Sequence, residues 1–279
     1  AYGALAGFGL PTQRTLLMIA VVALARCRRR ATRGPQSLAL AMLVLLAWDP
    51  LSVLSAGFWL SFAGVALLMM GLSRPRGPLS YLRTLGSMQL LMTVALLPLT
   101  IWFFGQASLL GALSNLVAVP VVSLLVVPLG LLGTAMWAVS PTIAGWLWQT
   151  AAWPVHGLWW LLQHMAKWPG AHWYLPTASP WTVALAMLGA LWVFLPRGVP
   201  ARGLGLLLFL PLLAPRLPSP QEGAFRVLMV DVGQGLSVLV RTRRHVLLFD
   251  AGARYPSGFD LGKAAVLPAM RALGVSHLD

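Results

Sequence analysis

Among the residues whose side chains could do chemistry, Asp49 is the most unusual, because it is the single acidic residue between Ala1 and Gln221. A carboxylate among apolar segments is costly to keep charged, so it marks a candidate functional site, and Arg14 is a candidate partner for it. Pro50 follows directly, and a proline sets a helix break. An interfacial aspartate at that break is the alternative interpretation.

A second set of candidate residues lies in the apolar segment Ile143–Ala166. At about 100° per residue, one helix face is polar, a neighbouring face is aromatic and the opposite side is apolar. These faces hold, respectively, Gln149, His156, Gln163 and Lys167; Trp146, Trp153, Trp160 and His164; and Leu147, Ala151, Leu158 and Met165. Proteins hold single-stranded nucleic acid without reading its sequence by placing aromatic faces beside polar groups. A helix lying in a membrane interface has the same pattern, so both interpretations stay open.

Two further acidic residues stand at turns near the end of the chain. Asp231 precedes the turn Gly233-Gln234-Gly235, and Asp250 precedes Ala251-Gly252. Aspartate favours such turns because its side chain accepts hydrogen bonds from nearby backbone N–H groups. Turn formation is therefore one interpretation of both residues. Cys27 is the single cysteine, which excludes an internal disulfide and a thiolate zinc cage.

The composition places most of these residues in a bilayer. Hydrophobic residues make up 58% of the chain and charged residues 9%, against about 25% charged in an ordinary soluble domain. Five of the six acidic residues follow Gln221, so the composition changes near Pro211–Pro220. We predict a helical membrane domain over 1–215, a linker over 216–224 and the start of a soluble domain over 225–279.

Eight apolar segments precede that change, about 20 residues being needed to span a bilayer. They are Leu5–Ala25, Leu38–Trp48, Ser52–Leu72, Leu85–Phe104, Leu109–Val139, Ile143–Ala166, Trp181–Leu195 and Leu204–Leu213. The segment Leu109–Val139 is too long for one straight helix and contains Pro120 and Pro128. Broken or re-entrant helices are tolerated where protein or a water-filled cavity surrounds them. The prolines therefore predict a broken helix and an internal cavity.

The net charge of +14 is concentrated in arginine clusters within 26–33, 74–83 and 197–202. Such clusters between spans follow the positive-inside rule, so the charge alone does not indicate nucleic acid. If all three clusters are cytoplasmic, two crossings separate the first two clusters and four separate the last two. Leu204–Leu213 then carries the chain outward, and the soluble domain lies outside the cytoplasm.

The last section of the chain is typical of an α/β domain. Three short runs rich in Val, Leu and Phe predict strands over Phe225–Asp231, Leu236–Arg241 and His245–Asp250. Asp260 is a suitable N-cap for a helix over Leu261–Leu273, and Gly274 suits its C-terminus. The expected order is strand, strand, strand and helix.

Three motifs give the sequence a resemblance to a known family. They are Gly7-Phe8-Gly9-Leu10-Pro11-Thr12-Gln13-Arg14; Asp49-Pro50-Leu51-Ser52 with Ser55-Ala56-Gly57-Phe58-Trp59-Leu60-Ser61-Phe62; and Asp231-Val232-Gly233-Gln234-Gly235 with Leu248-Phe249-Asp250-Ala251-Gly252. In this order, with apolar segments between them, the chain resembles the ComEC-type competence family of DNA-internalisation proteins. We expect the full protein to extend beyond both Ala1 and Asp279.

The resemblance implies a multi-pass protein of the inner membrane that passes single-stranded DNA and works with other competence-machinery proteins. It also implies a metallo-β-lactamase-like α/β domain that holds zinc or manganese in the full-length protein and could act as a nuclease. The family's metal-ligand loop has no match in this sequence, so we expect no cofactor or catalytic residue within it. His277 fits the lead-in to a further strand.

By the same resemblance Asp250 supports the metal loop from beside it. Two other functions remain open from the residues. One is a small-solute transporter with broken helices around a central site. The other is a membrane-tethered metallohydrolase whose spans serve as an anchor.

Overall fold

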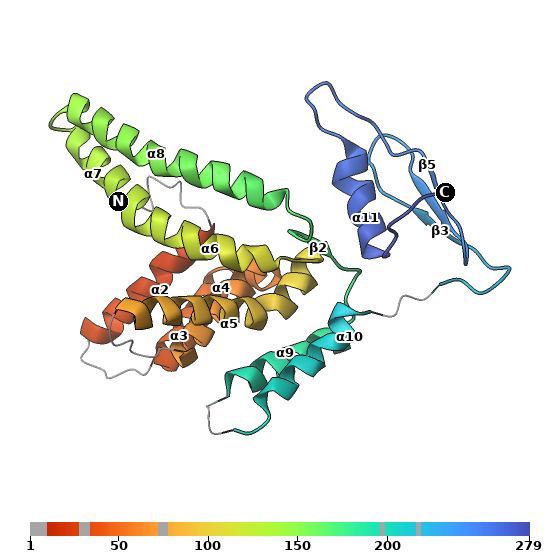
Figure 1. Ribbon diagram of the computed structural model, residues 1–279, viewed down its shortest axis with the longest axis horizontal. Helices are drawn as coiled ribbons and strands as arrows, with labels where there is room; N and C mark the ends of the chain where they lie inside the picture. Colours follow the sequence, from red (N-terminus) through yellow and green to blue (C-terminus); the bar gives the residue numbers. More distant parts are fainter. Residues whose placement is uncertain (1–9, 28–33, 72–77, 196–198, 216–218) are drawn as a thin grey trace. The chain divides into compact units, whose positions relative to one another are not determined.

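The computed structural model describes residues 10–27, 34–71, 78–195, 199–215 and 219–279 (Figure 1). The chain packs as two compact units. Unit 1 consists of Ala1–Leu99 and Ser108–His172, and unit 2 consists of Thr100–Ala107 and Trp173–Asp279. The fold is mostly helical, with a two-stranded and a three-stranded sheet. Gly7–Gly9 of the first motif and most of the arginine clusters lie outside the described residues.

The first elements of unit 1 pack around a small apolar core. They are α2 (Leu10–Cys27), α3 (Gly34–Trp48), the 3₁₀ turn η1 (Pro50–Leu54) and α4 (Ala56–Gly71). Ala41 and Leu45 of α3 pack with Phe58 and Phe62 of α4, and residues of α2 cover this cluster. The same arrangement brings Arg14 on α2 against the turn between α3 and α4.

The longer helices of the chain follow. They are α5 (Pro78–Phe104), α6 (Leu109–Val121), the π-helical turn η2 (Val122–Val126), α7 (Val127–Trp137) and α8 (Pro141–Ala166). The segment predicted to be broken, Leu109–Val139, contains one continuous helix over Leu110–Trp137, whose regular α-helical geometry is interrupted by the π-helical turn η2. Pro128 has no N–H and its ring crowds the carbonyl four residues back. The π-helical turn relieves this conflict, since the N–H of Val127 donates to the carbonyl of Val122.

Two helices in the described part of the chain are long and apolar enough to cross a membrane, Gly86–Phe104 and Leu110–Trp137. Only 22% and 6% of the residues in their most apolar stretches are buried, whereas the core helices of a soluble protein are mostly buried. The described residues of each predicted apolar segment are mainly helical, including the 3₁₀ helices η1 and η3. Four of the apolar helices are shorter: Gly34–Trp48, Ala56–Met70, Pro180–Phe194 and Arg202–Leu213.

Unit 2 contains a short sheet and a helical hairpin. β1 (Gln106–Ala107) pairs antiparallel with β2 (Trp173–Tyr174). The hairpin is α9 (Pro180–Phe194) against the 3₁₀ helix η3 (Arg202–Phe209) with α10 (Leu210–Leu213). It is closely packed, because a Cβ at Gly189 would collide with the carbonyl of Gly205. A 3₁₀ helix rises about 2.0 Å per residue, so both arms are about 22 Å long.

The α/β section of unit 2 has the predicted order of three strands and a helix. β3 (Arg226–Met229), β4 (Val238–Arg241) and β5 (Val246–Phe249) form an antiparallel sheet in that order. The π-helical turn η4 (Gly262–Val266) and α11 (Leu267–Ala272) follow. Asp260 accepts a hydrogen bond from the N–H of Lys263, as expected of an N-cap. Gly274 ends the helix with a φ of 66°.

Candidate functional site

Asp49 lies at the turn between α3 and α4. One carboxylate oxygen accepts a hydrogen bond from the N–H of Leu51 (3.2 Å), and the other accepts from the Oγ of Ser52 (2.8 Å). Asp49 therefore caps η1, with Pro50 in the first helical position. This geometry accounts for an aspartate at the break, which was the alternative interpretation of the residue. A functional role of its charge stays a prediction.

Arg14 reaches the same turn from α2. Its side chain is only 6% exposed, and its guanidinium donates to the Oγ of Ser55 at 3.0 Å. The Oγ of Ser55 in turn donates to the carbonyl of Ser52 (2.8 Å). Within the described residues, the ion pairs closer than 4 Å are Arg243–Glu222 and His245–Asp279. Arg14 and Asp49 are thus connected through the two serines rather than by a direct ion pair.

Gly57 provides the space for the Arg14 guanidinium. A Cβ at this position would lie 2.5 Å from an Nη atom of Arg14. The residues Ser52, Ser55 and Gly57 were not predicted as site residues. The signal that could have found them is a run of small residues next to a lone aspartate, since small side chains admit a bulky partner.

The candidate DNA-path residues of α8 lie together on its exposed side. Trp153 is 76% exposed and Trp160 is 61% exposed. Gln149, His156 and Gln163 are exposed as well. The packed side of the helix carries Ala144, Ala151 and Met165, all of which are buried. α8 therefore presents indole rings and polar groups along one side and small or apolar residues along the other.

The two histidines of α8 are oriented alike. The Nδ1 of His156 lies 2.8 Å from the carbonyl of Ala152, and the Nδ1 of His164 lies 2.8 Å from the carbonyl of Trp160. A carbonyl only accepts hydrogen bonds, so each Nδ1 acts as the donor in this geometry. The rings of Trp160 and His164 also pack, with centroids 4.3 Å apart.

The beginning of α8 is fixed on α7 by Trp148. Its ring stacks on that of Trp137 with centroids 5.5 Å apart, and its Nε1 donates to the carbonyl of Gly130 (3.4 Å). Gly133 admits the indole, because a Cβ there would lie 2.5 Å from that Nε1. This contact fixes which side of α8 faces α7, and therefore which side remains exposed.

In the α/β section, Asp231 and Asp250 stabilise turns. Asp231 accepts a hydrogen bond from the N–H of Gly233 (3.0 Å). Asp250 has a φ of 59°, and a single carboxylate oxygen accepts from the N–H groups of Ala251 (2.6 Å) and Gly252 (3.1 Å). The two turns lie together, since a Cβ at Gly235 would be 3.4 Å from the Cα of Gly252. Gln234 is exposed in the first turn.

These turns do not form a metal site by themselves. In the described ranges no group of three or more His, Cys, Asp and Glu side chains is placed to hold a metal ion. The carboxylates of Asp231 and Asp250 accept hydrogen bonds from backbone N–H groups, as turn residues do. Zinc or manganese would therefore need ligands in addition to these two residues.

His277 lies in the segment that returns to the sheet. The N–H of Asp279 donates to the carbonyl of Val246 (3.0 Å), beside the start of β5. The N–H of Val246 donates to the Asp279 carboxylate (2.7 Å) and lowers the pKa of that group. This pairing agrees with the expectation that His277 belongs to the lead-in to a further strand.

Comparisons with known proteins give matches that cover most or all of the chain. The family described as "Competence protein" matches residues 1–200. The chain is 34% identical to competence protein ComA of Neisseria gonorrhoeae, over 100% of this chain and 38% of that protein. It is 30% identical to the uncharacterized protein YcaI of Escherichia coli, over 96% of this chain and 36% of that protein. It is 27% identical to recombination protein 2 of Haemophilus influenzae, over 98% of this chain and 39% of that protein.

The chain thus spans less than two fifths of the length of these curated relatives. No solved structure matches it.

Proposed function

The chain belongs to the competence protein family, and from that premise we propose that it supplies the membrane part of a DNA-uptake protein. In this proposal the full-length protein crosses the inner membrane several times. It passes single-stranded DNA to the cytoplasm and receives that DNA from other proteins of the competence machinery. The two apolar helices Gly86–Phe104 and Leu110–Trp137 support the membrane location.

The exposed side of α8 is the observation that carries the DNA part of the proposal. Indoles and hydrogen-bonding groups alternate there over about four helical turns, from Gln149 to Gln163. Every base has a flat face that an indole can stack on, so such a surface holds a strand of any sequence. The side chains carry no carboxylate that would repel phosphates. A transport path for DNA of any origin requires both properties.

The α/β section is proposed to be the start of a metallo-β-lactamase-like domain. Its three-stranded sheet followed by a helix supports this assignment. One face of the sheet also remains uncovered, with Val227, Met229, Leu247 and Phe249 exposed. An apolar sheet face normally packs against another layer. Zinc or manganese in the full-length protein, with Asp250 beside it, stays part of this proposal.

The α/β section is proposed to lie outside the cytoplasm. The N–H and hydroxyl of Thr177, just before α9, both donate to the carbonyl of Ala272 at the end of α11. The two arms of the α9 hairpin are about equally long, so the chain returns to the side from which it left. With cytoplasmic arginine clusters, that side is the outer one.

Cysteine labelling checks this orientation. In the full-length protein carrying Cys27→Ser, a cysteine at the exposed Ser257 should react in intact inner membranes with a reagent that cannot cross them. Labelling that requires permeabilised inner membranes would mean that one of the helices counted as a membrane crossing does not cross the membrane. A cysteine at Arg202, in a predicted cytoplasmic cluster, is the matched control and should label in the opposite way.

The function itself is tested by following labelled donor DNA in cells that lack the full-length protein. DNA should still reach the cell envelope, and single strands should not reach the cytoplasm. A plasmid copy of the gene should restore entry. Normal transformation in the deletion strain would contradict the proposal and would favour a protein that transports another solute.

A further inference from the structure

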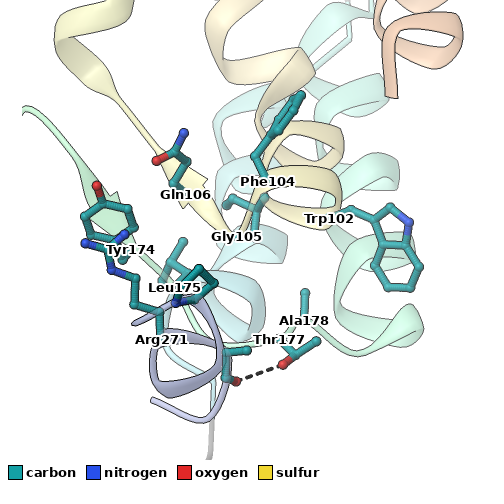
Figure 2. Close-up of a pocket in the computed structure, with 12 residues that line it drawn as sticks. Trp102, Phe104, Gly105, Gln106, Tyr174, Leu175, Thr177, Ala178 and Arg271 are labelled. Carbon is teal, nitrogen blue, oxygen red and sulfur yellow. Dashed lines mark hydrogen bonds between the residues drawn. The ribbon is translucent and has the colours of Figure 1, made fainter. Parts of the chain in front are cut away.

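Unit 2 contains a cavity of about 500 Å³ that the sequence did not predict (Figure 2). It lies among the end of α5, the short β1–β2 sheet, the segment after β2, and α11. Its lining includes Trp102, Phe104, Gln106, Tyr174, Thr177 and Arg271. The volume falls within the range of about 300–1,000 Å³ that is typical of sites for small ligands.

Arg271 is the charged side chain of this lining, and it is held in place from two directions. Its guanidinium lies over the ring of Tyr174, with its central carbon 3.4 Å from the ring centroid (Figure 2). The next residue, Ala272, accepts two hydrogen bonds from Thr177, at 2.9 and 2.8 Å. These contacts reduce the rotamer freedom that Arg271 would lose on binding a ligand.

Among the described residues, no carboxylate lies within 4 Å of the Arg271 charge, because the ion pairs that close involve other residues. The cavity lining contains no aspartate or glutamate. A planar guanidinium held on an aromatic ring suits a bidentate contact with a phosphate. The cavity therefore fits an anionic ligand.

We propose that this cavity binds one nucleotide of single-stranded DNA, with a phosphate at Arg271 and the base among the aromatic side chains. The proposal rests on the proposed function and names a place where the strand is held. Trp102 and Tyr174 offer flat faces, and the Gln106 amide offers both a donor and an acceptor to a base edge. Arg271 positions the backbone and provides no sequence preference.

The polar lining of the cavity favours DNA over a lipid. Arg271 of α11 and Gln106 of β1 both line it, and both belong to unit 2. An acyl chain in the cavity would leave the Gln106 amide without a partner, which is costly.

The test measures DNA binding by the purified full-length protein in nanodiscs of phosphatidylcholine. The probe is a fluorescent oligothymidylate, and a second probe of equal length lacks the bases. Arg271→Ala should weaken binding of both probes about 10-fold or more, because a charged hydrogen bond to phosphate is lost. Tyr174→Leu should also weaken binding of both, because Arg271 loses its support. Trp102→Leu should weaken binding of the oligothymidylate alone.

Arg244→Ala removes an exposed arginine of the same unit and is the matched control. Arg271→Lys keeps the positive charge and is the control for misfolding of the alanine variant. We expect this lysine variant to bind both probes more tightly than Arg271→Ala does. Photocrosslinking with 5-iodouracil in the probe should label the peptide that contains Tyr174 or Trp102.

Unchanged DNA affinity in Arg271→Ala would overturn the inference. In a second set of nanodiscs that also contain phosphatidylglycerol, loss of phosphatidylglycerol binding by that variant, with unchanged DNA affinity, would overturn it in favour of a lipid site. Either result leaves the proposed function standing, since that depends on donor DNA in the deletion strain. Normal transformation without the protein would remove the proposed function instead, whatever the nanodisc result.

Discussion

Replacing Trp153 and Trp160 together with leucine in the full-length protein is expected to reduce transformation about 10-fold or more. Both indoles are exposed on α8. Leucine keeps most of the apolar character but removes the flat ring, so stacking of about 1–3 kcal/mol per base is lost. Protein abundance and membrane insertion should stay normal. The measurement is transformation frequency at matched protein level, determined by immunoblotting of membranes.

Trp181→Leu is the matched control for this double variant. Trp181 is 80% exposed, like the two indoles of α8, but it lies at the start of α9. Its loss should leave transformation unchanged. Normal transformation in the Trp153→Leu/Trp160→Leu variant would show that α8 is an interfacial helix, with its tryptophans in a membrane belt.

The second large effect is expected at the turn that joins Arg14 and Asp49. Asp49→Ser retains a side-chain oxygen that caps η1 but removes the charge. Arg14→Met retains the volume but removes the buried cation and its hydrogen bond to Ser55. We expect each variant to reduce transformation about 10-fold or more at normal protein level, if the two charges serve transport.

The two variants combined test whether the charges act together. Arg14 and Asp49 contact the same turn through Ser55 and Ser52. Groups in one network typically couple by about 0.5–3 kcal/mol, so the double variant should be less impaired than the two single effects predict. Strict additivity would mean that the charges act independently. Normal transformation in Asp49→Ser would mean that Asp49 serves only as a cap.

The sequence predicted the elements better than it predicted the contacts. Apolar runs located the helices of the described residues between Leu10 and Leu213, because burying or embedding such a run is a local property of about 20 residues. Short apolar runs between turns predicted the strands β3, β4 and β5. The preference of aspartate for helix N-termini predicted that Asp260 caps the last helix. The packed side of α8 followed from periodicity, since Ala151 and Met165 are buried as the helical spacing indicated.

What the sequence did not predict depends on residues far apart in the chain. Arg14 and Ser55 are 41 positions apart, and Thr177 and Ala272 are 95 positions apart. No local pattern encodes such contacts, because they depend on how helices pack. The continuous helix through Pro128 was missed for a related reason. A proline in a helix can be accommodated by a π-helical turn, and the choice depends on the surrounding packing.

We propose that a single strand of DNA passes along α8. A photoreactive amino acid at position 153 or 160 of the full-length protein tests it in cells that are taking up labelled DNA. We expect illumination to link labelled DNA to the protein at both positions. We expect no link at position 181, which is at least as exposed. Normal uptake without a link at 153 or 160 would contradict a DNA path along α8.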